Sequence, residues 1–300
     1  MFELENINYL EIILFVLLCS LFFLFILKKE KEGFVEDKQD IVIHTENDIF
    51  DDFYSKVYDK LLVNNDKLDF EINHIFNPNE TSKPTMKNYN VLDIGCGSGQ
   101  LINQLTNLTI TCVGLDNSTS MVANAKKKFK KSNFKVGDAI NSLEFEEQTF
   151  SHVLCLDYTI YYFKEKRQFL ENCFYWLKPN GLLYLHVVNI KKFTSDPTTK
   201  HYKSKSSNNP VEFNYHSTFH RDESINFHSS TLEEPNVIFK ELFKFTDSKK
   251  VRINQHKLYM CSQNSIINMA IQAGFMLITY VEINVDTYEY HYLYSLQKPR

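Results

Sequence analysis

The sequence predicts an α/β protein built on a parallel sheet, and three observations support this fold class. From Asn90 onward, short β-rich runs alternate with stretches of helical periodicity, as in strands joined by crossover helices. A glycine turn, VLDIGCGSG over residues 91–99, follows the first run. After Val188 the alternation gives way to a segment rich in Ser, Thr, Asn and His. One α/β domain is therefore expected over residues 48–300, with an inserted cap over 190–262.

The first 27 residues predict a transmembrane anchor. Residues 9–27, YLEIILFVLLCSLFFLFIL, are long and apolar enough to cross a bilayer as a helix, and no small-residue cleavage site follows. The alternative, a buried apolar helix, would need a protein partner on every side. Lys28, Lys29 and Lys31 follow the run, while its other flank is acidic, so the remaining chain is expected in the cytoplasm of a single-pass membrane protein.

Residues 28–47 are charged and sparsely apolar, which predicts a juxtamembrane linker. In the next stretch, DIFDDFYSKVYDKLL, apolar residues recur at a spacing of four, which predicts a helix with Asp48, Asp51 and Asp52 at its N-terminal turn. A polar loop containing Pro78 and Pro84 is expected between this helix and the first strand.

The order of the remaining elements follows from periodicity and from helix stop signals. Strands are expected at residues 91–94, 110–115, 134–136, 150–156 and 182–188. Helices are expected at residues 100–107, 119–130 and 166–177, the last ended by Pro179 and Gly181. Alternating patterns such as EFNYHSTFH predict antiparallel strands in the cap. A helix over 263–272 and strands over 276–284 and 291–297 predict a terminal hairpin within the sheet.

Composition argues against several kinds of site. Beyond residue 40, acidic and basic residues are equal in number, which argues against a broad nucleic-acid-binding surface. The six cysteines have no paired spacing and are interpreted as reduced thiols. His216 and His220 stand four apart without a third ligand at a fixed spacing, so no metal site is predicted.

The charge beside the glycine turn discriminates between ligands. Gly95, Gly97 and Gly99 allow close backbone approach, but position 100 is Gln, so the GxGxxG dinucleotide pattern is not met. Asp93 would repel a pyrophosphate and instead suits a ligand that brings a cation, such as an α-amino group. An NAD-dependent oxidoreductase is disfavoured for both reasons.

Two further acidic residues end the next strands. Asp116 in VGLD is suited to accept hydrogen bonds from two ribose hydroxyls. Asp138 in VGDA is suited to an exocyclic amine, and Ala139 leaves room for a flat base. The sequence thus predicts a ligand with an amine, a ribose and an adenine, spread across the carboxyl ends of three strands.

With these motifs, residues from about 50 to 299 resemble the class I S-adenosylmethionine-dependent methyltransferases. DIGCGSG resembles their first motif, GLDNSTSM the ribose turn, and VGDA the adenine turn; FSHVLCLDYTIYYF resembles the fourth-strand motif and LKPNGLLYLHVVN the approach to the fifth strand. Asn180 replaces a usual glycine there, and Asn also tolerates the left-handed conformation. The resemblance implies a Rossmann-like, seven-stranded doubly wound sheet of order 3-2-1-4-5-7-6 with strand 7 antiparallel.

The resemblance also implies S-adenosylmethionine as cofactor. It assigns the cofactor's methionine part to Asp93, Gly95 and Gly97, the ribose to Asp116, the base side to Asn117 and Met121, and the adenine to Asp138 and Ala139. Leu156, Asp157 and Tyr158 would open beside the reactive methyl group. The apolar stripe of the first helix is expected to pack in the core, and Tyr54 or Tyr58 is the candidate within it to close over the cofactor.

Methyl transfer from a sulfonium is an in-line displacement that needs alignment in a dry pocket, here at the carboxyl ends of strands 4 and 5. Tyr158, with Tyr161, Tyr162 and Phe163, offers aromatic faces to the sulfonium. A general base is needed only if the acceptor loses a proton, and the candidates are Asp157, His186, His216, His220 and His256. Asp157, Tyr158 and His186 are the predicted catalytic residues.

The methyl acceptor is left open among a small molecule, a lipid and a protein, and the sequence assigns no oligomeric state. The alternative function is a membrane-tethered module that binds S-adenosylmethionine without turnover.

Overall fold

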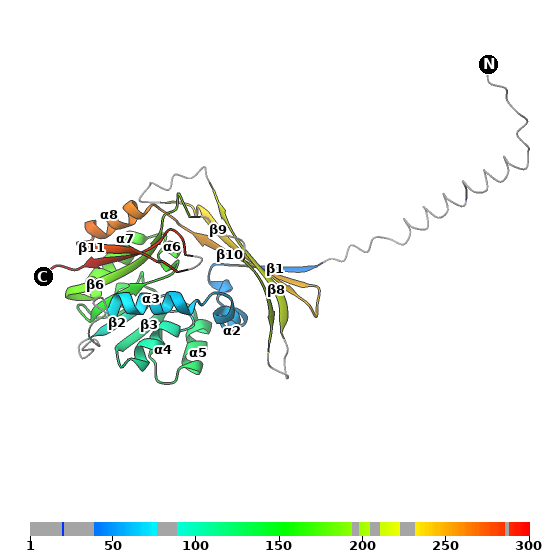
Figure 1. The fold of residues 1–300 in the computed structure, drawn as a ribbon, viewed down its shortest axis with the longest axis horizontal. Coiled ribbons are helices and arrows are strands. Elements are labelled where there is room, and N and C mark those ends of the chain that lie inside the picture. The colour runs from blue at the N-terminus through cyan, green and yellow to red at the C-terminus, as the bar shows by residue number, and fades with distance from the viewer. Residues whose placement is uncertain are drawn as a thin grey trace, which may run out of the picture.

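The computed structural model describes residues 20, 39–76, 89–193, 198–204, 211–222, 232–285 and 288–300, which form two sheets with flanking helices (Figure 1). The predicted anchor at residues 9–27, apart from Ser20, and linker residues 28–38 lie outside this description. Within the described ranges, we find no helix that combines the length and the apolar character needed to cross a membrane.

The larger sheet has seven strands in the order β11-β12-β6-β5-β2-β3-β4. Its strands are β2 (Asn90–Ile94), β3 (Thr111–Asp116), β4 (Phe134–Val136), β5 (Phe150–Cys155), β6 (Leu177–Val188), β11 (Met276–Glu282) and β12 (His291–Gln297). Strands β2 to β6 pair in parallel, whereas β12 is antiparallel to both β6 and β11. Counted along the chain, this is the predicted order 3-2-1-4-5-7-6 with the last strand antiparallel.

Helices cover both faces of this sheet, as a doubly wound fold requires. On one face lie α3 (Asn65–Phe76), α4 (Gln100–Asn107) and α5 (Thr119–Lys128), which bury Ile72, Leu105 and Val122 against the strands. On the other lie α6 (Thr159–Tyr162), α7 (Lys166–Trp176) and α8 (Gln263–Gln272), which bury Phe169 and Ile266. Figure 1 shows α3, α4 and α5 together on one side and α7 and α8 on the opposite side.

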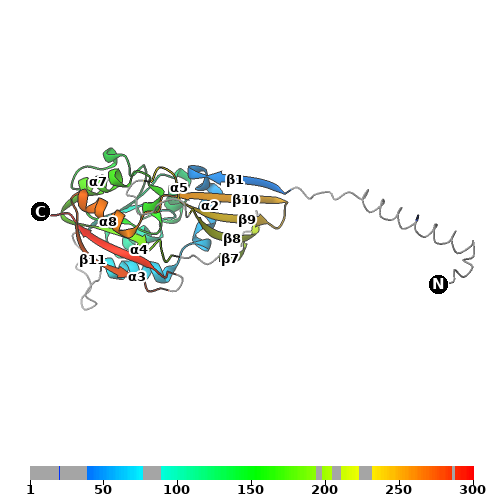
Figure 2. The same cartoon turned by 90° about the horizontal axis from the view of Figure 1, so that it is seen from above.

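The second sheet has five strands in the order β1-β10-β9-β8-β7 and extends away from the first (Figure 2). Its strands are β1 (Asp40–Thr45), β7 (Thr198–Lys203), β8 (Glu212–Arg221), β9 (Val237–Phe245) and β10 (Lys250–Leu258). The four strands of the predicted insertion pair antiparallel, as expected. Helix α2 (Asp52–Leu61), capped by Asp51, buries Tyr54 and Val57 against Phe213 and Phe243 of this sheet.

The structure corrects the prediction in two places near the N-terminus. Residues 40–45, expected within the linker, form β1, which pairs in parallel with β10, and Glu46–Ile49 form the 3₁₀ helix η1. The stretch expected as a polar loop contains α3, which buries Leu68, Ile72 and Ile75. Both elements carry local signals, the apolar run at residues 41–43 and the helical spacing of Leu68, Ile72 and Ile75, which lie within otherwise polar stretches.

Candidate active site

The glycine turn between β2 and α4 is built by backbone geometry that glycine alone adopts readily. Gly95, Gly97 and Gly99 have φ angles of 72°, 51° and 82°. The Asp116 carboxylate, at the end of β3, accepts hydrogen bonds from the backbone N–H of Gly97 at 2.8 Å and of Ser118 at 2.9 Å. The predicted ribose residue therefore also fixes the turn, although burial raises the pKa of its carboxyl.

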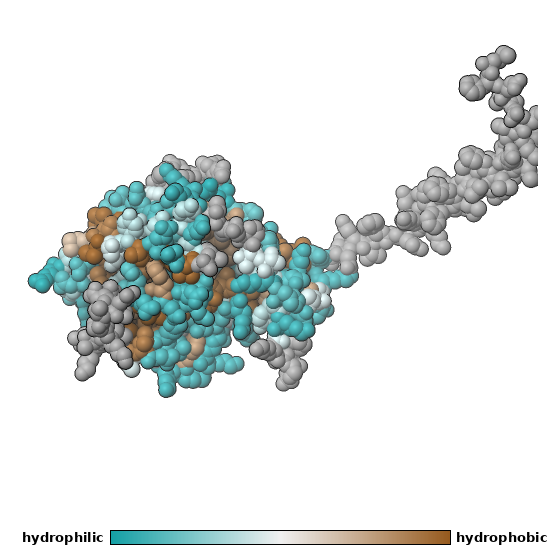
Figure 3. Space-filling model, in the orientation of Figure 1, coloured by the Kyte–Doolittle hydropathy of each residue, from teal (hydrophilic) through white to brown (hydrophobic). Residues whose placement is uncertain are grey.

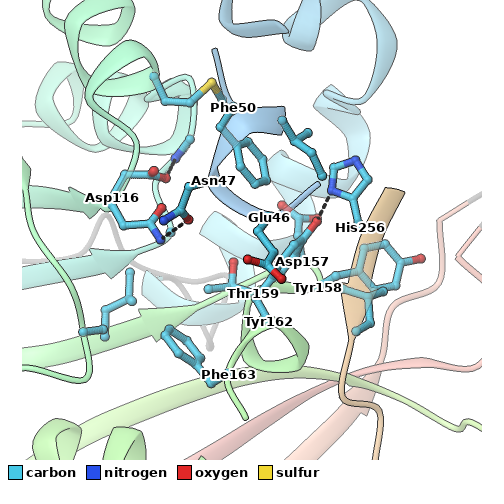
Figure 4. Close-up of a pocket in the computed structure, with 18 of the residues that line it drawn as sticks. Glu46, Asn47, Phe50, Asp116, Asp157, Tyr158, Thr159, Tyr162, Phe163 and His256 are labelled. Atoms are coloured by element: carbon cyan, nitrogen blue, oxygen red, sulfur yellow. Dashed lines mark hydrogen bonds between the residues drawn. The ribbon is translucent and has the colours of Figure 1, made fainter. Parts of the chain in front are cut away.

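A cavity of about 430 Å³ lies along this turn and between the two sheets (Figure 4). It is lined by predicted cofactor residues from the larger sheet: Gly95, Gly97, Asp116, Asn117, Met121, Asp138 and Ala139. Its other walls come from the N-terminal segment, which contributes Phe50, Tyr54 and Tyr58, and from the second sheet, which contributes Phe239 and His256. Asn117 contacts Asn47 of η1 through their amides at 3.4 Å, so the wall folds over the base side.

A smaller adjoining cavity holds the other two predicted cofactor residues, Asp93 and Leu156. The two cavities share Gly95, Gly97, Asp157 and Tyr158 in their walls. Burial, together with the charges of Asp157 and Glu71, raises the pKa of the Asp93 carboxyl well above its usual range. A cationic group arriving here would stabilise the Asp93 carboxylate, as predicted for an α-amino group.

Helix α3 adds a charged cluster to the smaller cavity that sequence reasoning missed. Lys67 Nζ lies 2.7 Å from Glu71 Oε1 and 2.7 Å from Asp157 Oδ1, although Lys67 and Glu71 are almost fully buried. Burial raises the pKa of Glu71 to about 7, against the opposing effect of Lys67. Burial alone would lower the pKa of Lys67, but the negative charges of Asp157 and Glu71 raise it above the ordinary value.

The three predicted catalytic residues do not all reach the cavities. Asp157 lines both and has a φ of 53°, a strained left-handed conformation at the end of β5. Tyr158 lines both as well and packs 5.5 Å from the Phe219 ring. His186 is fully buried and lines neither cavity, because it packs against His291, which it contacts at 2.8 Å, and against Glu71, which lies 3.9 Å from its Nδ1.

Among the cap histidines that the structure describes, only His256 lines the larger cavity. His216 and His220 lie on β8, where they contact Thr199 and Thr218, and neither lines a cavity. Among the described residues, no cluster of three or more His, Cys, Asp or Glu side chains is arranged to hold a metal ion.

Residues 91–181 match a protein family described as a methyltransferase domain. These residues contain the glycine turn, Asp116, Asp138 and the β5 turn of the site described above. Residues 91–181 are therefore identified as a methyltransferase domain.

Curated relatives of this methyltransferase domain are similar over part of their length. A ubiquinone biosynthesis O-methyltransferase from Bradyrhizobium diazoefficiens is 32% identical over 116 residues, 38% of this chain and 46% of that protein. Phosphoethanolamine N-methyltransferase 1 from Caenorhabditis elegans is 24% identical over 203 residues, 63% of this chain and 42% of that protein. The chain therefore spans less than half the length of each of these relatives.

Solved methyltransferase structures share the fold of this chain over most of its length. The CcbJ methyltransferase from Streptomyces caelestis has a TM-score of 0.62 at 14% identity, covering 85% of this chain and 100% of that one. The S-adenosylmethionine-bound amino pentose methyltransferase CalS10 from Micromonospora echinaspora has a TM-score of 0.56 at 17% identity, covering 82% and 96%.

The residues present fit S-adenosylmethionine. A Cβ atom added at Gly97 would lie 3.5 Å from Met121 Cε and 3.8 Å from Tyr58 Cε1, two cavity-lining side chains, so this glycine keeps the backbone open to a ligand. Asp116 and Asp138 stand at the ends of β3 and β4, in the order needed for the ribose and the adenine. Asp93 and the Lys67 cluster offer charges of both signs for an amino-acid moiety.

Proposed function

We propose that the chain transfers the methyl group of S-adenosylmethionine to an acceptor bound in the larger cavity. The observation that carries this proposal is the extent of that cavity. It runs from the predicted adenine residue Asp138, past the glycine turn, to Asp157 and Tyr158, and on to side chains of the second sheet such as Phe239. The space beyond the predicted methyl position is thus walled by the cap and is suited to an acceptor.

Methyl transfer requires mainly that the acceptor atom be aligned with the carbon–sulfur bond in a water-poor site. S-adenosylmethionine supplies an electrophilic methyl carbon on a sulfonium. The protein's part is to hold the donor on the glycine turn and to exclude water with aromatic side chains of the cavity such as Phe50 and Tyr162. Their ring faces also favour a cationic group.

The names of the relatives suggest which acceptor chemistry to test. One is an O-methyltransferase, one an N-methyltransferase acting on phosphoethanolamine, and one structural neighbour acts on an amino pentose. Hydroxyl and amine acceptors are accordingly proposed for this chain. The acceptor is a small molecule or a headgroup-like moiety, because the cavity is walled by aromatic side chains on the cap side.

Residues 9–27 are proposed to anchor the domain to a bilayer, with the domain on the cytoplasmic side, as their apolar length and basic C-terminal flank predict. Retention of the full chain in membranes after alkaline carbonate extraction, and its release on deletion of residues 1–27, would support the anchor. Release of the full chain would contradict it.

The function itself is tested by calorimetric titration of the full chain in detergent with S-adenosylmethionine, and with NAD as the control ligand. Binding of the first alone, weakened at least about tenfold in Asp93→Ala and Asp116→Ala, is expected from the loss of charge-assisted hydrogen bonds. Formation of S-adenosylhomocysteine with phenol or benzylamine as acceptor would establish turnover. Binding of NAD, or of neither ligand, would contradict the proposal.

A further inference from the structure

The larger cavity contains a hydrogen-bonded chain of three side chains that no part of the cofactor assignment uses. Tyr162 Oη lies 2.7 Å from His256 Nδ1, and His256 Nε2 lies 2.8 Å from Glu241 Oε2. The chain runs inward from the cavity, since Tyr162 is 37% exposed, His256 1% and Glu241 0%. Figure 4 shows Tyr162 and His256 meeting at the cap side of the pocket.

The surroundings of Glu241 fix the direction of these hydrogen bonds. Its carboxylate accepts from Tyr215 Oη at 2.8 Å and from Asn254 Nδ2 at 2.9 Å. The Asn254 amide is oriented by Arg252, whose Nε donates to its Oδ1 at 2.8 Å. Burial alone would raise the pKa of Glu241, but hydrogen bonds from His256, Asn254 and Tyr215 lower it below the ordinary value.

An ionised Glu241 can only accept hydrogen bonds, so the proton of His256 must sit on Nε2. In the neutral ring, Nδ1 then carries a lone pair and accepts the hydroxyl hydrogen of Tyr162. The free lone pairs of Tyr162 Oη remain available on the cavity side. This is the arrangement by which a buried carboxylate orients a histidine to accept a proton in hydrolytic triads.

The position of helix α6 brings Tyr162 close to the proposed position of the methyl group. Helix α6, which ends at Tyr162, begins directly after Asp157 and Tyr158, where the transferable methyl group is proposed to lie.

We infer that Tyr162 accepts a proton from the methyl acceptor, and that His256 and Glu241 are positioning residues that give Tyr162 this capacity. The inference rests on the proposed function and specifies its acceptor as a hydroxyl or a neutral amine that gives up a proton when it is methylated. As the acceptor's oxygen or nitrogen forms its bond to the methyl carbon, the carbon–sulfur bond breaks and its electron pair stays on sulfur. The acceptor's proton passes to Tyr162 Oη, and the original Tyr162 proton passes to His256 Nδ1.

The resulting imidazolium would lie between Tyr162 and the Glu241 carboxylate, which stabilises its charge. The other groups facing His256 are Phe239 on β9 and, from the N-terminal segment, Phe50 and Tyr54. These contribute rings and one hydroxyl, so Glu241 supplies the charge that orients the imidazole.

The first test needs no turnover. In the full chain saturated with S-adenosylhomocysteine, ¹⁵N NMR of labelled histidine should show His256 protonated at Nε2 and unprotonated at Nδ1. Glu241→Leu should abolish this preference, because it removes the acceptor of the Nε2 proton. The matched control Tyr215→Phe removes a donor to Glu241 but leaves its charge, and should keep the wild-type tautomer. A proton on Nδ1 in the wild type would overturn the inference.

The second test compares two aromatic acceptor probes at neutral pH: phenol, which must lose a proton, and 4-nitrothiophenol, which is already ionised. Tyr162→Phe and Glu241→Gln should lower kcat with phenol by about 100-fold, the usual contribution of general base catalysis. Turnover of the thiolate should change less than about threefold, and the control Tyr215→Phe should retain both activities.

Two results would show that the three side chains do not accept a proton. One is an equal loss of kcat with both probes in the variants, and the other is that the wild type methylates the thiolate but not phenol. Failure of the protein to bind S-adenosylmethionine or to methylate either probe would instead contradict the proposed function. The two failures are thus distinguishable.

Discussion

Lys67 Nζ lies 2.7 Å from Asp157 Oδ1 and thereby joins helix α3 to the strained turn that follows β5. The same ammonium contacts Glu71 at 2.7 Å, so one buried cation holds two carboxylates beside the glycine turn. This ion cluster forms part of the wall of the smaller cavity. The negative charges of Asp157 and Glu71 raise the pKa of the Asp93 carboxyl, and the positive charge of Lys67 lowers it.

Replacing Lys67 with Met should destabilise the fold, because it leaves Glu71 buried and unpaired. Removal of one partner from a buried ion pair costs about 3–5 kcal/mol. Urea unfolding followed by the fluorescence of Trp176, the chain's single tryptophan, measures this change. The matched control is Lys56→Met, which breaks an exposed helix pair with Asp52 and should cost less than about 0.5 kcal/mol. Equal losses in the two variants would contradict the role of Lys67.

Gly97→Ala and Gly99→Ala should separate ligand binding from stability. Both have positive φ, but a Cβ at Gly97 faces cavity-lining side chains, whereas one at Gly99 would lie 2.6 Å from the Phe134 ring. Gly97→Ala should therefore weaken S-adenosylmethionine binding at least about tenfold with a loss of only about 1–2 kcal/mol. Gly99→Ala should destabilise by about 2–4 kcal/mol. Calorimetric titration and urea unfolding of each variant measure the two quantities, and unchanged affinity in Gly97→Ala would refute the assignment.

Acid should destabilise the domain through histidines that are buried without charge. Burial lowers the pKa of His152 from 6.5 to about 4, so the unfolded chain binds a proton more readily than the native state. The stabilising contribution is complete above pH 6.5 and is lost as the pH falls toward 4. At pH 5 this histidine alone removes about 2 kcal/mol.

His152→Phe should reduce that pH dependence, since its ring packs among Phe76, Tyr89 and Tyr184 and would remain apolar at every pH. The difference in unfolding free energy between pH 7 and pH 5 is the measurement. His220→Phe, at an exposed position on β8, is the control and should retain the wild-type dependence. Identical pH profiles for wild type and His152→Phe would rule out His152 as a source of the effect.

Arg252 should be needed to hold the N-terminal wall of the cavity. It donates to Asp51 Oδ2 at 2.6 Å and to the carbonyl oxygen of Ile49 at 2.8 Å, which ties β10 to the segment that carries Phe50. Arg252→Met should destabilise by about 1–3 kcal/mol through the buried acceptors it leaves. Lys257→Met, which breaks an exposed pair with Glu46, should stay within about 0.5 kcal/mol in the same urea titration. A loss in Arg252→Met no larger than in the control would contradict this role.

Elements of the larger sheet could be predicted because their signals are local. Helix α4 and strands β4 and β12 have the predicted bounds, and the turn at Gly95 and Gly97 was expected from its glycines. Strand β1 and helix α3 were not predicted, although residues 41–43 are apolar and Leu68, Ile72 and Ile75 have helical spacing. Residues 40–45 gain their strand conformation by pairing with β10, some 200 positions away, and Lys67 in α3 is polar in sequence but buried in the fold.

The sequence by itself determined the methyltransferase fold class and predicted which residues meet the cofactor, because a parallel sheet brings strand ends together and their acidic residues follow directly in the chain. The tertiary structure decided which side chains line the cavity beside the second sheet. Glu241, His256 and Tyr162 belong to β9, β10 and α6, and only packing of the second sheet against the first aligns them. The tertiary structure also shows that His186 does not line the cavity. Which way a strand side chain points depends on strand register and on the helices that cover the sheet, and the position of the residue in the chain does not reveal this.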